Sequence, residues 1–212
     1  SDKPLISVIT TFYEAEEYLE GFLEDITSQT IFSQCELVIV DTGSPGSEQE
    51  IIKSYLQKFD NIKYHRHHSR LSPTKGFNLA LKASTGKYVT WAMLDDRKKT
   101  DSLEVLLREL EANPGVDLVY GDCLVTPEKN QKFSDTDSTT ILENSSSCVL
   151  CVFLGIESST RLDPIFLSSS FLPYKVSLII LEGLCISSAF LKGACNAVLG
   201  IPVIRSKAPS DI

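Results

Sequence analysis

Two adjacent carboxylates, Asp95 and Asp96, are the residues whose type and position most directly indicate chemistry in this chain. They come directly after an apolar, strand-like run, 87–94, and before a strongly charged run. Ligands of an open α/β sheet bind beyond the carboxyl ends of the strands, where two carboxylates can hold a divalent cation against a phosphorylated ligand. The alternative is structural: the pair solvates a turn, while Asp101 and Glu104 cap the next helix as an Asp-x-x-Glu box.

Further polar residues follow two other strand-like runs. Thr11 and Tyr13 come at the end of the first run, and Asp41 ends the second, followed by Gly43. A hydroxyl and an aromatic face suit a base, a carboxylate can accept hydrogen bonds from a base or ribose, and glycine permits a tight turn. Each residue alone is as easily structural, but their shared placement favours a nucleoside pocket beside the acidic pair.

The elements that must position these residues alternate along the first 137 residues. We expect strands at 5–10, 36–41, 62–65, 88–93 and 117–124, and helices at 16–29, 48–59 and 73–83. Ser72 and Pro73 predict the start of the third helix, as N-cap and first helical residue. This alternation predicts an α/β fold with a Rossmann-like, doubly wound, mostly parallel sheet.

Composition limits the classes of partner. The chain has 212 residues and a net charge of −8, which argues against a nucleic-acid partner. Its first residues show no signal-peptide pattern and its six cysteines form no dense framework, so we expect a cytoplasmic protein with reduced thiols. His65, His67 and His68 could suggest a metal cluster, but neighbouring residues of an extended segment point to opposite sides.

The last part of the chain has a different composition. Residues 138–212 contain only 10 charged residues, so we expect them to be less compactly packed than the first half. The apolar run 176–191 is short for a bilayer span and predicts a buried or interfacial helix.

Several segments together resemble the amino-terminal half of the family-2 glycosyltransferases, GT-A-fold enzymes that move a sugar from a nucleotide diphosphate. The segments are 6–19, 29–30, 36–44, 86–89 and 94–96, within a region of about 5–125. The resemblance implies a nucleotide pocket and a divalent-cation site, Mn²⁺ or Mg²⁺. Its nucleotide-binding residues would be Thr11, Tyr13, Asp41, Arg70 and Asp95, and its metal ligands Asp95 and Asp96. Thr11, Glu14 and Thr42 depart from the proline, asparagine and second acid usual in the family.

The resemblance implies a hexosyltransferase-like enzyme, inverting and metal-dependent, with a UDP-linked sugar donor. The acceptor hydroxyl would belong to a glycan, a lipid-linked molecule or another compound. Residues 1–130 would form the nucleotide-sugar-binding domain and 131–212 a divergent acceptor-side segment, which leaves open a peripheral contact with the inner face of a membrane.

The general base that an inverting enzyme needs has no recognisable motif here. The carboxylates available to it beyond residue 130 include Glu143, Glu157, Asp163 and Glu182. The alternative function is therefore a nucleotide-binding module that lacks a positioned base and does not catalyse transfer.

Overall fold

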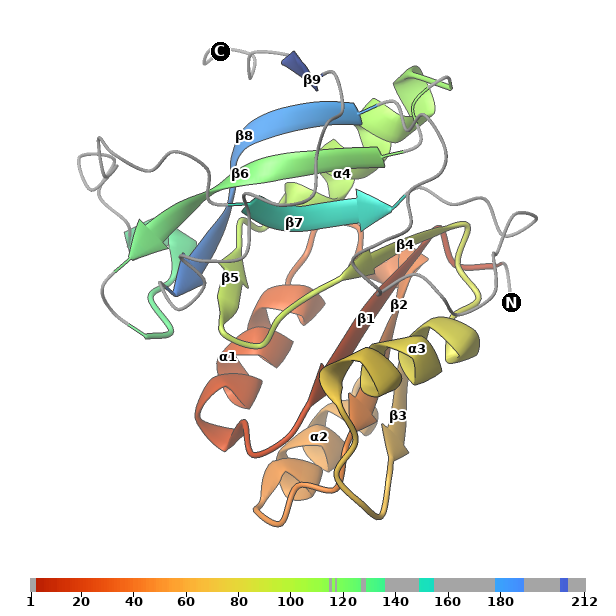
Figure 1. Ribbon diagram of the computed structural model, residues 1–212, viewed down its shortest axis with the longest axis vertical. Helices are drawn as coiled ribbons and strands as arrows, with labels where there is room; N and C mark the ends of the chain where they lie inside the picture. Colours follow the sequence, from red (N-terminus) through yellow and green to blue (C-terminus); the bar gives the residue numbers. More distant parts are fainter. Residues whose placement is uncertain are drawn as a thin grey trace.

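The computed structural model describes residues 3–114, 116, 118–126 and 129–135, together with three later strands. The strands and helices follow the expected alternation up to residue 126 (Figure 1). They are β1 (Ile6–Phe12), α1 (Glu16–Thr27), β2 (Cys35–Asp41), α2 (Glu48–Leu56), β3 (Ile62–Arg66), α3 (Pro73–Ala83), β4 (Tyr88–Trp91), β5 (Asp96–Lys98), α4 (Ser102–Ala112), β6 (Leu118–Thr126), β7 (Val149–Leu154), β8 (Leu178–Ser188) and β9 (Val203–Arg205).

The described strands form one sheet in the order β3-β2-β1-β4-β7-β6-β8-β5, with β9 beside β8. The first four strands in this order are parallel to one another, with Ile6 of β1 opposite Cys35 of β2 and Tyr88 of β4. The strand β7 runs antiparallel to both β4 and β6. The predicted mixed α/β fold with a parallel central sheet is confirmed.

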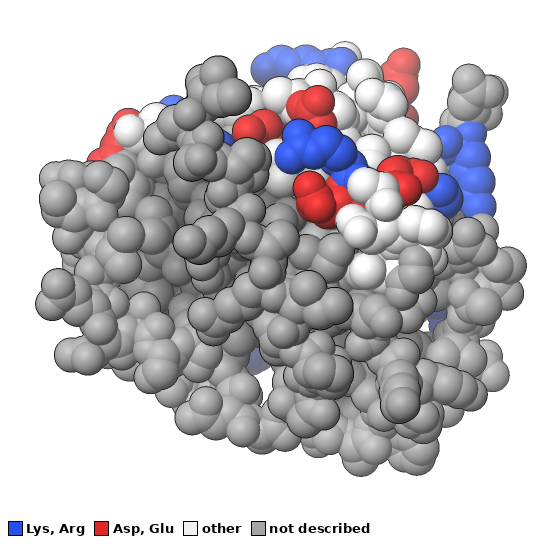
Figure 2. Space-filling view, turned by 90° about the horizontal axis from the view of Figure 1, so that it is seen from above, with Lys and Arg blue, Asp and Glu red and all other residues white. Residues whose placement is uncertain are grey.

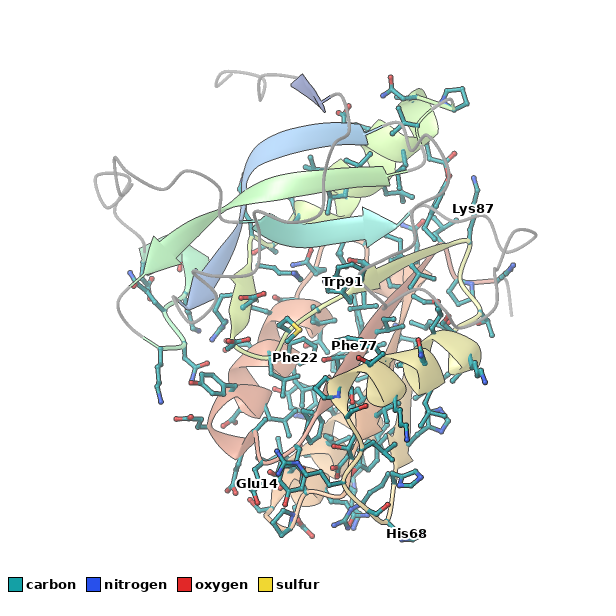
Figure 3. All side chains as sticks on the ribbon, in the orientation of Figure 1. Glu14, Phe22, His68, Phe77, Lys87 and Trp91 are labelled. Atoms are coloured by element: carbon teal, nitrogen blue, oxygen red, sulfur yellow. The ribbon has the colours of Figure 1, made fainter. Side chains whose placement is uncertain are left out.

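Helices cover both faces of the parallel strands. The apolar stripes of α1, α2 and α4 pack into one core, in which Phe22 is 1% exposed. The helix α3 packs on the opposite face through Phe77 and Ala80 (Figures 1 and 3). Full burial of a phenylalanine side chain contributes about 1.5–3 kcal/mol, so these stripes hold the helices against the sheet.

The start of α3 follows the sequence prediction. The Ser72 hydroxyl accepts a hydrogen bond from the Lys75 amide at 3.4 Å, and Pro73 occupies the first turn. One turn later, Gly76 faces Thr11 of β1, and a Cβ atom at this glycine would overlap the threonine side chain. The missing side chain lets α3 approach β1 closely.

Glu36 ties the amino ends of three parallel strands together. This side chain is 2% exposed, and its carboxylate accepts hydrogen bonds from the Ser7 hydroxyl at 2.5 Å and the Gly86 amide at 3.2 Å. The Thr85 amide and hydroxyl also donate to it, and the Lys63 amine lies 2.5 Å away. The network lies at the edge opposite the predicted site: in Figure 3, Lys87 marks this end, and Glu14 and His68 mark the other.

The structure corrects one predicted element and adds a strand that was not predicted. The run 176–191 is not a helix, because Leu178–Ser188 forms strand β8, parallel to β6. A short apolar run fits a strand and a buried helix equally well, and Gly183 disfavours a helix by about 1 kcal/mol. The charged run after Asp95 contains a strand, β5, which pairs with β8.

The predicted Asp101–Glu104 capping box is also absent. Asp101 makes no side-chain cap hydrogen bond at the start of α4, and Glu104 accepts one from Thr30 instead. The cap of α4 comes instead from Gln29, just beyond the carboxyl end of α1. Its side-chain oxygen accepts hydrogen bonds from the Leu103 amide and the Ser102 hydroxyl, each at 3.1 Å. A tertiary contact thus replaces the local one.

In the view from above, basic and acidic side chains lie next to one another on the described part of the surface (Figure 2). Most of residues 138–212, on which we based the expectation of looser packing, lie outside the described residues.

Candidate functional site

The turns after β1 and β2 are joined by direct hydrogen bonds. The Thr42 amide and hydroxyl both donate to the Phe12 carbonyl, at 3.0 and 2.9 Å, and the Glu14 amide donates to the Ser44 hydroxyl at 3.0 Å. Glu14 has a φ of 52°, a left-handed conformation that asparagine adopts more readily than glutamate. The turn geometry thus favours asparagine over glutamate at this position.

The turn after β2 also contacts the segment after β3. The His67 amide donates to the Asp41 carbonyl at 2.7 Å. Gly43 has a φ of 87°, and a Cβ atom there would lie 3.1 Å from the Ser69 carbonyl carbon and 3.4 Å from the Arg70 nitrogen. Only glycine fits this conformation and this approach, which brings Arg70 to the ends of β1 and β2.

Tyr13 and Arg70, two residues predicted for the nucleotide site, are in direct contact. The Arg70 guanidinium carbon lies 4.4 Å from the centre of the Tyr13 ring, a cation–π geometry. A hydrogen bond with Glu14 raises the pKa of Tyr13 above its ordinary value, so the phenol is neutral near pH 7. The pair offers a flat aromatic surface beside a cation, an arrangement that suits a base and a phosphate.

Asp41 lies at the same edge but is almost completely buried, at 1% exposure. One carboxylate oxygen accepts a hydrogen bond from the Ser44 amide and the other from the Tyr64 hydroxyl, both at 2.8 Å, and the Arg66 Nε lies 3.4 Å from the second oxygen. Burial, and then the bond to Asp41, raise the pKa of Tyr64. These contacts fix the carboxylate, and the oxygen bonded to the Ser44 amide has a second lone pair.

Thr11 is placed differently from the other predicted residues. Its hydroxyl donates to the Val40 carbonyl at 3.0 Å, and its side chain packs under Gly76 of α3. Thr11 is 9% exposed, and these contacts place its side chain between β1 and α3.

Asp95 and Asp96 follow the neighbouring parallel strand, β4, which ends at Trp91. The chain leaves the sheet after Ala92, whose amide donates to the Ile9 carbonyl at 3.0 Å, and a turn with a 3.3 Å hydrogen bond from the Asp96 amide to the Met93 carbonyl follows. Asp95 is half-buried, and Asp96 is 8% exposed at the start of β5. Within the described part of the chain, no group of three or more His, Cys, Asp or Glu residues could hold a metal ion.

Sequence reasoning missed two functional candidates, Asp25 on α1 and Gln29 just beyond its carboxyl end. Asp25 binds the side chain of Arg97 and the amide of Lys98, and the Gln29 amide group donates to the Lys99 carbonyl at 2.9 Å. The available signal was polar residues four apart beside the apolar stripe of α1, a spacing that puts both on one helix face. Together they hold the segment that follows the acidic pair.

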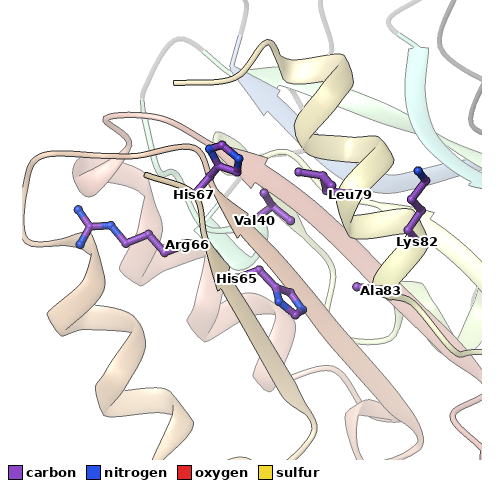
Figure 4. A pocket seen from close by; sticks show the side chains of 7 residues that line it. All are labelled: Val40, His65, Arg66, His67, Leu79, Lys82 and Ala83. Carbon is purple, nitrogen blue, oxygen red and sulfur yellow. The ribbon is translucent and has the colours of Figure 1, made fainter. Parts of the chain in front are cut away.

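A cavity of about 370 Å³ lies elsewhere, between β3 and α3 (Figure 4). Its lining residues are Val40, His65, Arg66, His67, Leu79, Lys82 and Ala83. Side chains alternate along a strand, so Val40 faces α3 while Asp41 faces the opposite side of the sheet. This cavity contains none of the residues predicted to bind the nucleotide.

Residues 7–153 match the family model described as glycosyl transferase family 2. The chain belongs to this family. The match confirms the resemblance and extends past the amino-terminal region on which it was based.

Curated relatives of this family-2 chain match about half of it or somewhat more. An uncharacterized glycosyltransferase of Methanocaldococcus jannaschii is 32% identical over 120 residues, which are 56% of this chain and 41% of the relative. A putative teichuronic acid biosynthesis glycosyltransferase of Bacillus subtilis, TuaG, is 33% identical over 105 residues, 48% of this chain and 40% of the relative. The chain thus spans less than half the length of these relatives.

Solved structures of glycosyltransferases share the fold, which is GT-A. S. aureus TarS in complex with UDP matches 57% of this chain and 36% of its own, with a TM-score of 0.54 and 24% identity. The mannosyltransferase PcManGT from Pyrobaculum calidifontis, in complex with GDP-Man and Mn²⁺, matches 60% and 37%, with a TM-score of 0.52 and 23% identity. In the described residues of the family-2 chain, no helix is long and apolar enough to cross a membrane.

Proposed function

We propose that this chain is a metal-dependent, inverting glycosyltransferase that moves a sugar from a UDP-linked donor to an acceptor hydroxyl. One observation carries the proposal: the acidic pair Asp95–Asp96 follows β4 next to the strand whose end presents the Tyr13–Arg70 pair. Membership of family 2 supports the transferase activity. The UDP bound to TarS and the Mn²⁺ bound with GDP-Man to PcManGT support the donor class and the cation by analogy of fold.

The residues at the ends of β1, β2 and β3 would bind the nucleoside. Tyr13 offers its ring to the base, and Asp41 accepts a hydrogen bond from the base or ribose through the second lone pair of the oxygen bonded to the Ser44 amide. Arg70 is exposed and pairs with the donor's phosphates while its guanidinium stays over the Tyr13 ring.

The acidic pair fits a hard divalent cation. Mg²⁺ and Mn²⁺ prefer oxygen ligands, and Mg²⁺ at phosphate sites is held by one or two carboxylates, phosphate oxygens and waters. Asp95 is the more accessible of the two carboxylates and is the direct ligand, while the more buried Asp96 contributes charge beside it. A bound cation would offset the charge of the departing diphosphate.

The remaining part of the proposal concerns residues 131–212. We assign donor binding to 1–130 and acceptor binding to the later segment, whose acceptor is a glycan or another hydroxyl compound. The candidate bases Glu143, Glu157, Asp163 and Glu182 lie outside the side chains that the structure describes.

Calorimetry with UDP tests the donor site. We expect UDP to bind at least about tenfold more tightly with Mn²⁺ than in excess chelator, a difference of about 1.4 kcal/mol, and Asp95→Asn or Asp96→Asn to remove that gain. Equal affinity with and without Mn²⁺ would contradict the metal role.

A transfer assay separates the enzyme from the nucleotide-binding module. Release of UDP from a UDP-sugar, in the presence of Mn²⁺ and a mixture of acceptors, supports catalysis. UDP binding without donor hydrolysis or transfer supports the module that lacks a positioned base.

A further inference from the structure

An ion pair directly follows the acidic pair in the sequence and connects it to α1. Arg97 is 3% exposed, and its Nε and one terminal nitrogen lie 2.6 and 2.8 Å from the two carboxylate oxygens of Asp25. This is the bidentate geometry in which a planar guanidinium and a carboxylate bind most specifically.

The same carboxylate also binds the backbone beyond Asp96. The Lys98 amide donates to Asp25 at 2.9 Å, so one side chain of α1 fixes both the side chain of Arg97 and the main chain of β5. The other terminal nitrogen of Arg97 donates to the Asn130 carbonyl at 3.3 Å. Gly21, one turn earlier in α1, provides the space, since a Cβ atom there would overlap the guanidinium.

The cost of burying Asp25 and Arg97 indicates that this pair positions the chain around it more than it stabilises the fold. The free-energy cost of removing two charges from water offsets most of their mutual attraction. Apolar residues of similar volume often stabilise a fold at least as much as a buried ion pair does. A bidentate pair instead fixes orientation, and a metal site needs its ligands held within about 0.5 Å of the productive geometry. Asp96 is joined to Arg97 by a single peptide bond, so the pair constrains where the carboxylates lie.

We propose that Asp25 and Arg97 are positioning residues that hold Asp95 and Asp96 in the arrangement that binds the cation and the donor's diphosphate. The proposal rests on the metal-dependent donor site proposed above. Neither Asp25 nor Arg97 contacts the ligand; Asp25 acts through Arg97 and the Lys98 amide. The nucleoside contacts, which belong to the ends of β1, β2 and β3, are independent of the pair.

The test compares Asp25→Asn with Glu24→Gln in the full chain. Both changes remove one negative charge at neighbouring residues of α1, but Glu24 is half-exposed and lies 3.8 Å from Arg97. For each variant, calorimetry measures the affinity for UDP with Mn²⁺ and for uridine alone. We expect Asp25→Asn to weaken Mn²⁺-dependent UDP binding by about tenfold or more, the effect typical of residues that orient metal ligands, and to leave uridine binding within about twofold. Glu24→Gln should leave both affinities unchanged.

Asp25→Asn with unchanged UDP affinity, or with equal losses for UDP and uridine, would overturn the positioning role. If Asp25→Asn does not fold, Arg97→Lys tests the positioning role instead, because lysine keeps the positive charge but cannot make the bidentate contact with Asp25. A selective loss of Mn²⁺-dependent affinity in Arg97→Lys supports the role, and no loss overturns it. Asp95→Asn identifies a failure at the earlier step: if this change at the direct ligand too leaves Mn²⁺-dependent UDP binding unchanged, the metal site itself is wrong, and the positioning role falls with it.

Discussion

Replacing Glu36 with alanine is expected to lower the free energy of unfolding by about 2–4 kcal/mol. The carboxylate is buried at the amino ends of β1, β2 and β4 and accepts hydrogen bonds from three neighbouring residues besides its ion pair with Lys63. Truncation removes their common acceptor.

The individual contacts determine the magnitude. The Ser7 hydroxyl is fully buried, and losing its acceptor costs about 1–3 kcal/mol. The Gly86 amide keeps a hydrogen bond to that hydroxyl at 2.8 Å, and Thr85 is exposed, so its amide can turn to water. Lys63, which is 40% exposed, returns to water at a cost below about 1 kcal/mol. The Ser7 hydroxyl therefore accounts for most of the loss.

Urea denaturation measures the change, with Glu111→Ala as the matched control. The Glu111 carboxylate also binds a lysine, Lys87 at 2.7 Å, and a hydroxyl, Tyr88 at 2.9 Å, but it is 48% exposed, so its loss should cost less than about 1 kcal/mol. Equal costs for the two variants would refute the role assigned to the Glu36 network.

The network also predicts a dependence on pH. Burial alone would raise the pKa of Glu36, but the hydrogen bonds from Lys63, Ser7 and Thr85 outweigh it and lower the pKa below its ordinary value of 4.5. A lowered pKa in the folded state means that the stabilisation is present above that value and is lost as the pH falls through the folded pKa. Glu36→Gln should therefore lose less stability than the wild type on acidification below about pH 4.5.

Three further predictions concern the turns, the site and the packing of α3. Glu14→Asn should raise the free energy of unfolding by about 0.5 kcal/mol, because asparagine tolerates the φ of 52° better, whereas Glu14→Ala should bring no such gain; thermal denaturation measures both. Asp41→Ala should weaken uridine and UDP binding alike, by about tenfold in calorimetry, because the proposed contact does not involve phosphate; a loss confined to UDP would contradict that contact. Gly76→Ala should cost about 1–3 kcal/mol in urea denaturation by overlapping Thr11, and combining it with Thr11→Ala should restore part of this; strict additivity of the two changes would refute the overlap.

Local patterns predicted the elements of the first half well. The apolar stripes of α1 and α2, the Ser72–Pro73 start of α3 and the apolar runs of β1 and β2 each lie in one short stretch of chain, so periodicity and capping chemistry suffice to find them. The run that forms β8 was misread because its pattern fits either a strand or a helix, and its pairing with β6 and β5 decides between them.

The sequence alone also determined that the predicted site residues would follow parallel strands of one sheet. The direction of the chain in a βαβ unit places the carboxyl ends of its strands at a common edge, so Tyr13, Asp41 and Asp95 needed no contact information to be grouped. Only the tertiary structure decided what each side chain does there. The Tyr13–Arg70 contact and the Asp25–Arg97 pair join residues far apart in the chain. The burial of Asp41 likewise depends on distant segments. No local pattern encodes such contacts, because they depend on how whole helices and strands pack against one another.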